Sequence, residues 1–291
     1  MSVAPSIVDT HVHVVARDET RFPLRPSGIG SQWFREHPVN AEEYHIIATA
    51  AGVERAVLVQ AHGAYGSDNR YVLDALRVAP DRFVGVVIVD PADPDAVGQL
   101  RALAATPGCH GVRLFGIGVE APVWFDGDVG IALWDTAVEL DLRIVATLLA
   151  PELPRLATML ARHPGVPVVL DHCGFPDLRG GPPFAGVESL VELADHPGLH
   201  LKVTSHVLEG AGADAGALVE QLVAAFGAER LVWGSDYPQT HDRTYAELVA
   251  LGRTACRGLP ASDQARVLGE NALRLWPALA PGAGAGASAS T

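Results

Sequence analysis

Eight short apolar runs rich in β-branched residues recur at nearly even intervals along the 291-residue chain, and they constrain its fold more than any other feature. Most are continuously apolar rather than alternating, which is typical of parallel strands covered on both faces. We therefore predict eight strands, at residues 7–14, 56–61, 83–90, 111–116, 143–149, 166–172, 199–205 and 231–236.

Helical patterns separate these runs. Apolar residues spaced three and four apart predict helices at 67–79, 128–141, 151–163, 186–195, 215–227 and 242–257. Regular alternation of strand and helix implies parallel pairing through right-handed crossovers, and eight units favour closure into a single (β/α)8 barrel. An open doubly wound sheet is the alternative, but no GxGxxG sequence follows the first run.

Composition supports one large domain. Hydrophobic residues make up 48% of the chain and charged residues 19%, a balance that can bury a large core. We expect the barrel to occupy residues 1–277 and residues 278–291, rich in Gly, Ala and Ser, to form a disordered tail.

Charge and cysteine content limit which partners and which cellular compartment suit the protein. The net charge of −13, without any basic run, argues against nucleic-acid binding, and no apolar run is long enough to span a membrane. Three widely spaced cysteines indicate neither a disulfide framework nor a CxxC zinc site, which fits a reducing cytoplasm. We expect a cytoplasmic protein that takes a small-molecule substrate, with a homodimer as the default association.

The first strand contains an HxH pair, His11 and His13, in the sequence "IVDTHVHV". Side chains alternate along a strand, so both imidazoles should point the same way, into the barrel, with Asp9 on the same face. Val8, Val12 and Val14 would face the helices. The alternative is a pair of hydrogen-bonded core histidines without a functional role.

Two more ionisable residues follow apolar strands. His172 ends the sixth run in "LDHCGFPD", and Asp236 ends the eighth in "WGSDYP". Buried ionisable groups are costly unless paired or bound to a cation. Together with His11 and His13 they suit one divalent ion, such as zinc, with water in an open position. The same four residues could also act without metal, Asp236 as general base and the histidines as donors to a carbonyl oxygen.

Further residues are candidates for substrate contacts. Arg113 should point inward, either toward a substrate carboxylate or into an internal ion pair with an acid such as Asp171. Tyr65 and His62 follow the second strand and should lie on the catalytic face of the barrel. The long segment 17–44 after the first strand is expected to form part of a lid.

Two other residues carry weaker expectations. Lys202 shares a strand face with Thr204, and we expect it to balance the charge of a neighbouring acid rather than take part in catalysis. The remaining histidines should be solvated, with His241 as the exception because it follows the Asp236 turn.

These segments resemble the amidohydrolase superfamily, and within it the amidohydrolase-2 branch of lactonases, decarboxylases and hydratases. The HxH pair, "LDHCGFPD" and "WGSDYP" carry the resemblance, and it extends through "VQAHGAYGSDNRYVLDAL", "HGVRLF", "LWDTAVELDLRI", "LKVTS" and "ENALRLW". The likeness is greatest to lactonases of 2-pyrone-4,6-dicarboxylate and of sugar lactones.

The resemblance implies hydrolysis of a small carboxylated or polyhydroxylated lactone. Asp236 would take a proton from water, while the matching histidines polarise the carbonyl or hold a metal. No Lys or Glu ends the fourth or fifth strand to bridge two ions, so we expect one ion or none. Metal-dependent decarboxylation of an aromatic or unsaturated acid, and a non-catalytic binding barrel, remain as alternatives.

Overall fold

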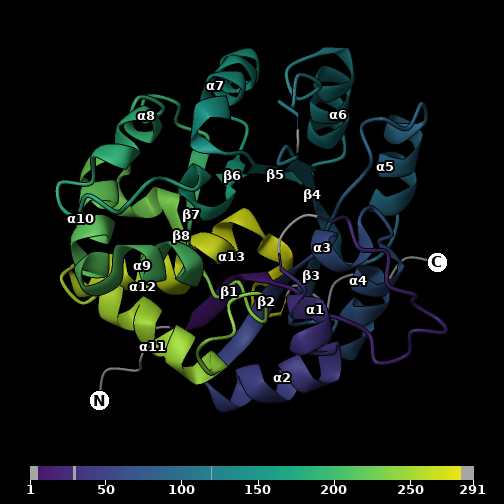
Figure 1. Cartoon of the computed structure of the whole chain (residues 1–291), viewed down its shortest axis with the longest axis horizontal. Helices are drawn as coiled ribbons and strands as arrows, with labels where there is room; N and C mark the ends of the chain where they lie inside the picture. The colour runs from purple at the N-terminus through teal and green to yellow at the C-terminus, as the bar shows by residue number, and fades with distance from the viewer. Residues whose placement is uncertain (1–5, 29–30, 119, 283–291) are drawn as a thin grey trace.

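The computed structural model describes residues 6–28, 31–118 and 120–282, and it is a barrel of eight strands ringed by helices (Figure 1). The strands pair in parallel in chain order, each with its successor. Their bounds are β1 Ile7–Val12, β2 Val53–Val59, β3 Phe83–Val87, β4 Cys109–Phe115, β5 Arg143–Thr147, β6 Val168–Leu170, β7 Leu199–Thr204 and β8 Leu231–Gly234. Each overlaps a predicted strand.

The first and last strands meet, so the sheet is nearly closed. Thr10 Oγ1 donates to the Trp233 carbonyl at 2.7 Å, and the Asp236 amide donates to the His11 carbonyl at 2.8 Å. A further bond runs from the His13 amide to the Tyr237 carbonyl, 2.9 Å away. The predicted (β/α)8 barrel is confirmed, and the open sheet is excluded.

Helices cover the outside of the strands. Their bounds are α1 Trp33–Glu36, α2 Ala41–Ala50, α3 His62–Tyr65, α4 Arg70–Ala75, α5 Ala96–Ala104, α6 Asp128–Glu139, α7 Leu153–Arg162, α8 Glu188–Val191, α9 Ser205–Ala211, α10 Ala215–Phe226, α11 Tyr245–Ala255, α12 Ala261–Ala265 and α13 Asn271–Leu275. All six predicted helices contain one of these, although α4 and α8 are shorter than predicted. Among the described residues, no helix is long and apolar enough to cross a membrane.

The sequence analysis missed two of the longer helices, α2 and α5. The N-terminus of α2 does carry a start signal, because Asn40 and Glu43 form a capping box. In that box the Asn40 side chain accepts from the Glu43 amide at 2.8 Å. Treating 17–44 as one lid segment hid this signal.

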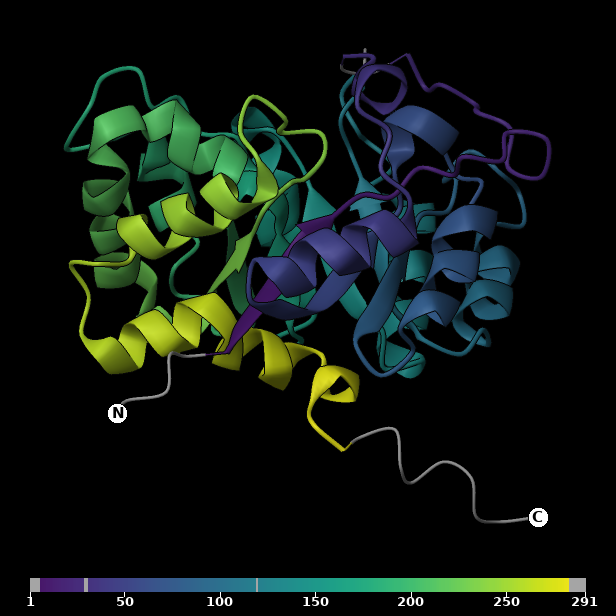
Figure 2. The ribbon, with the colours of Figure 1, turned by 90° about the horizontal axis from the view of Figure 1, so that it is seen from below.

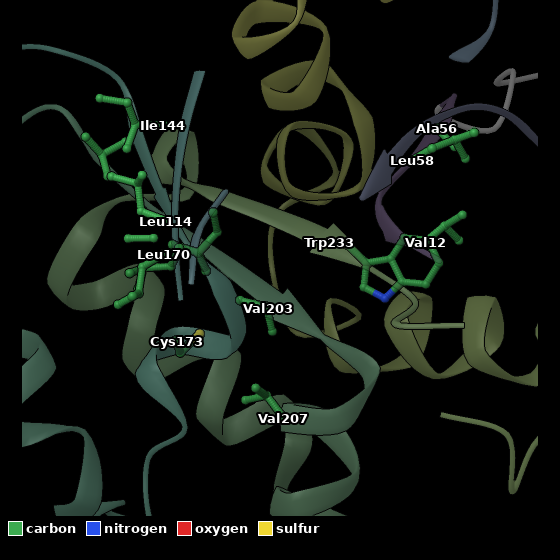
Figure 3. Packing of buried hydrophobic residues seen from close by; sticks show 14 of the residues in the cluster. Val12, Ala56, Leu58, Leu114, Ile144, Leu170, Cys173, Val203, Val207 and Trp233 are labelled. Carbon is green, nitrogen blue, oxygen red and sulfur yellow. The ribbon is translucent and has the colours of Figure 1, made fainter. Parts of the chain in front are cut away.

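Apolar side chains form two clusters on opposite faces of the strands. The larger lies between the strands and the helices, and Figure 3 shows part of it, including Leu58, Leu170 and Trp233. The smaller is built mainly of valines from six strands and from the C-terminal segment, namely Val8, Val57, Val59, Val84, Val86, Val145, Val169, Val232, Ala272, Leu275, Trp276 and Leu279. Strand alternation places these valines inside the barrel.

The C-terminal segment covers the end of the barrel where the strands begin. Figure 2 shows the last helices at the same end as the start of β1. The amide of Asn271 in α13 donates to the Ala228 and Leu231 carbonyls at 2.7 Å, which fixes α13 beside the start of β8. A functional site must therefore lie at the opposite, carboxyl end of the strands.

The packed chain extends past the predicted domain boundary at residue 277. Residues Pro277–Leu279 form a 3₁₀ turn, and Leu279 is fully buried in the interior cluster. Trp276 and Leu279, both in the interior cluster, anchor this turn. Of the predicted tail 278–291, residues 283–291 lie outside the described part of the chain.

Candidate active site

Four distant residues converge at the carboxyl end of the barrel. Nε2 of His11 lies 3.2 Å from Nε2 of His13, and Oδ1 of Asp236 lies 3.5 Å from both nitrogens. The rings of His11 and His172 have centroids 4.7 Å apart. All four side chains are buried. The structure thus brings together the four residues that the sequence analysis named as catalytic and metal-binding.

An irregularity in β1 aims the two histidines. Asp9 pairs with Ala56, but Val12 pairs with Leu58, so three steps along β1 match two steps along β2. One extra residue in β1 breaks the alternation of its side chains. After this bulge the imidazole of His11 points into the barrel.

The bulge also corrects the prediction for Asp9, which does not share the face of His11 and His13. Its carboxylate accepts hydrogen bonds from the hydroxyls of Tyr245 at 2.9 Å and Tyr44 at 3.3 Å, which belong to the surrounding helices α11 and α2. Burial raises the pKa of Asp9. The prediction failed because it assumed unbroken alternation from Asp9 to His13. For the same reason Val8, predicted to face the helices, lies in the interior cluster.

Left-handed backbone turns aim the other two residues. The strand β6 ends at Leu170, and the following turn holds His172 at a φ of 52°. Asp236, after β8, has a φ of 58°. Such backbone is strained by about 1–3 kcal/mol in residues with a side chain, and it concentrates at functional sites.

A hydrogen bond at Nδ1 fixes the ring of His13 and that of His172. Nδ1 of His13 lies 2.9 Å from the Val59 carbonyl, which can only accept, so this nitrogen carries the hydrogen and Nε2 keeps its lone pair. Nδ1 of His172 bonds to Oγ1 of Thr204 at 2.8 Å, so the other ring nitrogen, Nε2, takes no part in that hydrogen bond. A histidine that binds a metal is usually oriented by a hydrogen bond at its other ring nitrogen, the one that does not bind the metal. Both rings are held in this way.

His11 has a partner for either tautomer. Its Nδ1 lies 3.2 Å from Oδ1 of Asp171 and 3.2 Å from Nζ of Lys202. Donating to Asp171 leaves the lone pair on Nε2, as a ligand requires. Accepting from Lys202 places the hydrogen on Nε2, as a donor toward His13 or a substrate oxygen requires.

Asp171 is the centre of a saturated polar cluster beside His11. Its oxygens lie 2.7 Å from Arg113 Nε, 2.8 Å from Thr147 Oγ1 and 2.8 Å from Lys202 Nζ. Burial opposes the charge, but Lys202 and Arg113 hold the pKa of Asp171 well below its usual range. The internal ion pair that we considered for Arg113 is present, and Lys202 pairs with the same acid, as expected for charge balance.

Asp236 is much less satisfied. Among the described residues its buried Oδ1 has no hydrogen-bond partner, and Oδ2 has only Thr240 Oγ1, at 3.4 Å. Burial disfavours its charge, yet His172 in particular holds the pKa of Asp236 below its usual value. Burial lowers the pKa of His172 to about 4, so near neutral pH this ring is uncharged and able to bind a cation.

The donor set fits one divalent metal ion. The ligand atoms of His11, His172 and Asp236 all lie within 4.8 Å of one another, and the unpartnered Oδ1 gives such an ion an anionic ligand. His13 borders this group through its contacts with His11 and Asp236. Nitrogen and carboxylate ligands of this kind suit zinc.

The other predicted substrate contacts lie at the same end of the barrel. His62 stacks on Phe115 with ring centroids 4.2 Å apart, and its buried Nδ1 has no hydrogen-bond partner among the described residues. Burial lowers the pKa of His62 to about 4. Tyr65 is buried, with a pKa raised by burial to about 12, and its hydroxyl accepts from the Ala16 amide at 2.9 Å. The structure therefore uses Tyr65 to hold the chain that follows β1.

Part of segment 17–44 does lie over the site. Trp33, in α1, stacks on the ring of His13 with centroids 5.6 Å apart. Residues 29–30 of the predicted lid lie outside the described part of the chain.

Sequence reasoning missed two threonines that support the site. Thr147 binds Asp171, and Thr204 binds His172. Both are polar residues at the end of an apolar strand, the same signal that identified Asp236, so it could have found them.

Comparison with known proteins assigns the chain to a family. The family model described as "Amidohydrolase" matches residues 8–278, which is most of the chain. The protein belongs to the amidohydrolase family, which confirms the resemblance seen in the sequence.

Its relatives include lactone-hydrolysing enzymes. L-fucono-1,5-lactonase of Burkholderia ambifaria is 32% identical over 237 residues, 78% of this chain and 81% of its own. 4-Sulfomuconolactone hydrolase of Hydrogenophaga intermedia is 27% identical and covers 81% of this chain and 76% of its own. A crystal structure of a protein titled putative 2-pyrone-4,6-dicarboxylic acid hydrolase, from Pseudomonas putida, superposes with a TM-score of 0.78 at 27% identity, covering 95% of this chain and 99% of its own.

Proposed function

We propose that this protein hydrolyses a small lactone with a water molecule activated beside His11, His172 and Asp236. The observation that carries the proposal is the buried Oδ1 of Asp236, which lacks a hydrogen-bond partner among the described residues although three imidazoles surround it. A relative named as a lactonase, 32% identical over most of the chain, supports lactones as the substrate class.

In the proposed reaction, water attacks the lactone carbonyl carbon while Asp236 accepts one of its protons. The imidazole of His11 stands beside Asp236, and in the tautomer that accepts from Lys202 its Nε2 can donate to the developing oxyanion. Collapse breaks the bond between the carbonyl carbon and the ring oxygen. Asp236 then returns the proton to that oxygen, and the product is a hydroxy acid.

The lowered pKa of Asp236 makes it a weak base, so much of the activation must come from polarisation of the carbonyl or the water. A divalent ion held by His11, His172 and Asp236, with His13 beside them, would supply this Lewis-acid chemistry. Zinc is the ion that we propose.

Charge in the site favours a neutral, polyhydroxylated lactone over a carboxylated one. The two buried cations, Arg113 and Lys202, both form ion pairs with Asp171. Neither cation is therefore free to pair with a substrate carboxylate. We propose that Arg113, His62 and Tyr65 contact substrate hydroxyls, with the unpartnered Nδ1 of His62 the best placed.

A panel of lactones tests the substrate class. Proton release should be at least 10-fold faster, in kcat/KM, for neutral sugar lactones than for carboxylated lactones of similar size. Aromatic and unsaturated acids should give no carbon dioxide. Carbon dioxide release without lactone turnover would replace this proposal with decarboxylation, and inactivity on both panels, with zinc supplied, would favour the binding barrel.

Metal removal decides how His11 acts. The metal content of protein purified without chelator should be at least one zinc per chain. Chelation should lower kcat/KM at least 100-fold, and added zinc should restore it. Full activity in metal-free protein would instead assign His11 as a hydrogen-bond donor.

We also propose a cytoplasmic location and a homodimer. Cys109, Cys173 and Cys256 are all buried and free, which is consistent with a reducing compartment. Light scattering of the purified protein would test the dimer.

A further inference from the structure

A second group of metal-type ligands lies outside the barrel. Glu36 and His37 lie at the end of α1, within the predicted lid, and His241 lies in the loop that follows Asp236. His241 is more than 200 positions from Glu36 and His37 in the chain, yet the ligand atoms of all three lie within 4.8 Å of one another. Neither the proposed catalysis nor the core uses them.

Local hydrogen bonds prepare His241 as a ligand. Its Nδ1 lies 2.9 Å from the Gln239 carbonyl and 3.2 Å from the Pro238 carbonyl. Carbonyl oxygens only accept, so Nδ1 carries the hydrogen and Nε2 keeps its lone pair. This is the arrangement that orients histidines in known metal sites, where the non-ligating nitrogen donates to a carbonyl or carboxylate.

The second histidine is already beside the first. The rings of His37 and His241 stack with centroids 4.0 Å apart and planes 26° apart, and Glu36 adds a carboxylate. Glu36 and His37 are exposed and His241 is half-buried, so an ion from solvent can reach them and a water can complete its coordination. Small side-chain rotations would bring the nitrogens to one ion, because His37 is exposed and free to turn.

We propose that Glu36, His37 and His241 form a second divalent-cation site, specific for zinc-like transition ions. Two imidazoles and one carboxylate are a ligand set that such ions prefer over calcium or magnesium. The site is separate from the one that His11, His172 and Asp236 form, and it does not depend on the proposed reaction.

An ion at this site joins two segments that border the active site. The helix α1 also carries Trp33, which stacks on His13, and His241 is adjacent to Thr240, which contacts Asp236. Binding would therefore hold the lid segment against the loop that carries Asp236.

Zinc binding to metal-free protein tests the proposal. The wild type should retain one more zinc per chain than the double variant His37→Asn with His241→Asn, and Glu36→Gln should weaken this binding about 10-fold. The matched control is His45→Asn, which changes a half-buried histidine on α2 that contacts Phe83, and it should bind zinc as the wild type does.

The same count in an Asp236→Asn background separates the two sites. Removing His37 and His241 should again lower the count by one, whether or not the protein has lactonase activity. The second site would be overturned if removing His37 and His241 changed neither the zinc content nor the zinc affinity, in the wild type and in Asp236→Asn alike.

Proteolysis tests the link between the segments. Arg35 is exposed in α1, and zinc should slow tryptic cleavage there at least 5-fold in the wild type but not in the double variant. Zinc retention without this protection would overturn the link between α1 and the loop, while leaving the site itself in place.

Discussion

Two buried aspartates lie close to His11, and their surroundings differ sharply. Asp171 receives hydrogen bonds from Arg113, Thr147 and Lys202, with His11 also in contact. In Asp236, Oδ2 accepts one long hydrogen bond, from Thr240. Its Oδ1 lies 3.5 Å from Nε2 of both His11 and His13 but lacks a hydrogen-bond partner among the described residues. Both are 1% exposed or less.

The difference separates a structural role from a chemical one. A buried carboxylate surrounded by cations and donors is held in place, and it has no lone pair left for substrate. A buried carboxylate with an open oxygen is costly to the fold and is available to water, a metal or a proton. The site therefore needs both, with Asp171 fixing His11 and Asp236 reacting.

The largest expected effect is loss of catalysis in Asp236→Asn. The amide keeps the shape but cannot accept a proton, so kcat/KM on the best lactone should fall by roughly 10²- to 10⁴-fold. Stability should be unchanged or higher, because an unpaired buried charge is removed. Steady-state kinetics and urea unfolding measure the two effects. Wild-type activity in this variant would remove Asp236 from the mechanism.

Asp171→Asn should mainly reduce stability. It leaves Arg113 and Lys202 as buried cations without their counter-ion, at a cost of about 3–5 kcal/mol in the free energy of unfolding. Urea unfolding measures the loss. The matched double variant, Asp171→Asn with Lys202→Met, should lose less than the sum of the single variants. Additive losses would contradict the saturated cluster.

Acid should destabilise the protein through His172. Its pKa is about 4 in the folded chain against 6.5 for the free side chain, so between these pH values the unfolded state binds the extra proton. The free energy of unfolding should therefore fall as pH drops from 6.5 to 4, by on the order of 3 kcal/mol from this group. Measured by urea unfolding across that range, the free energy of unfolding should change less steeply with pH in His172→Asn than in the wild type. An equal slope in both proteins would contradict the assignment.

A matched pair of threonine variants gives the smallest effect. Thr147→Val removes a 2.8 Å hydrogen bond to Asp171 and should lower the free energy of unfolding by about 2 kcal/mol. Thr240→Val removes only the 3.4 Å contact to Asp236 and should change it by less than about 0.5 kcal/mol. Thermal and urea unfolding compare them. Equal losses would show that the two aspartates are satisfied to the same degree.

The strand positions and the four converging residues were predictable because their signals are local. Eight apolar runs, each bounded by turn residues, indicate eight strands wherever their partners lie. The carboxyl ends of parallel barrel strands meet at one end, so His11, His172 and Asp236 could be expected to converge before any distance was known.

The helix α2 and the end of the packed chain were partly visible in the sequence. Asn40 and Glu43 have the spacing of a capping box, and Leu279 interrupts a Gly- and Ala-rich stretch. These signals are short, and only packing against the barrel shows that they matter.

The sequence by itself determined the barrel, the end that carries the site, and the imidazoles and carboxylate that line it. These features depend on the spacing of hydrophobic residues and on the order of the strands, and both can be read directly from the sequence. Tertiary structure alone decided that Asp9 turns outward, that Asp171 is saturated and that Asp236 is left open. Each of these depends on a register shift or a hydrogen bond between strands distant in the chain, and no local pattern encodes such a partner.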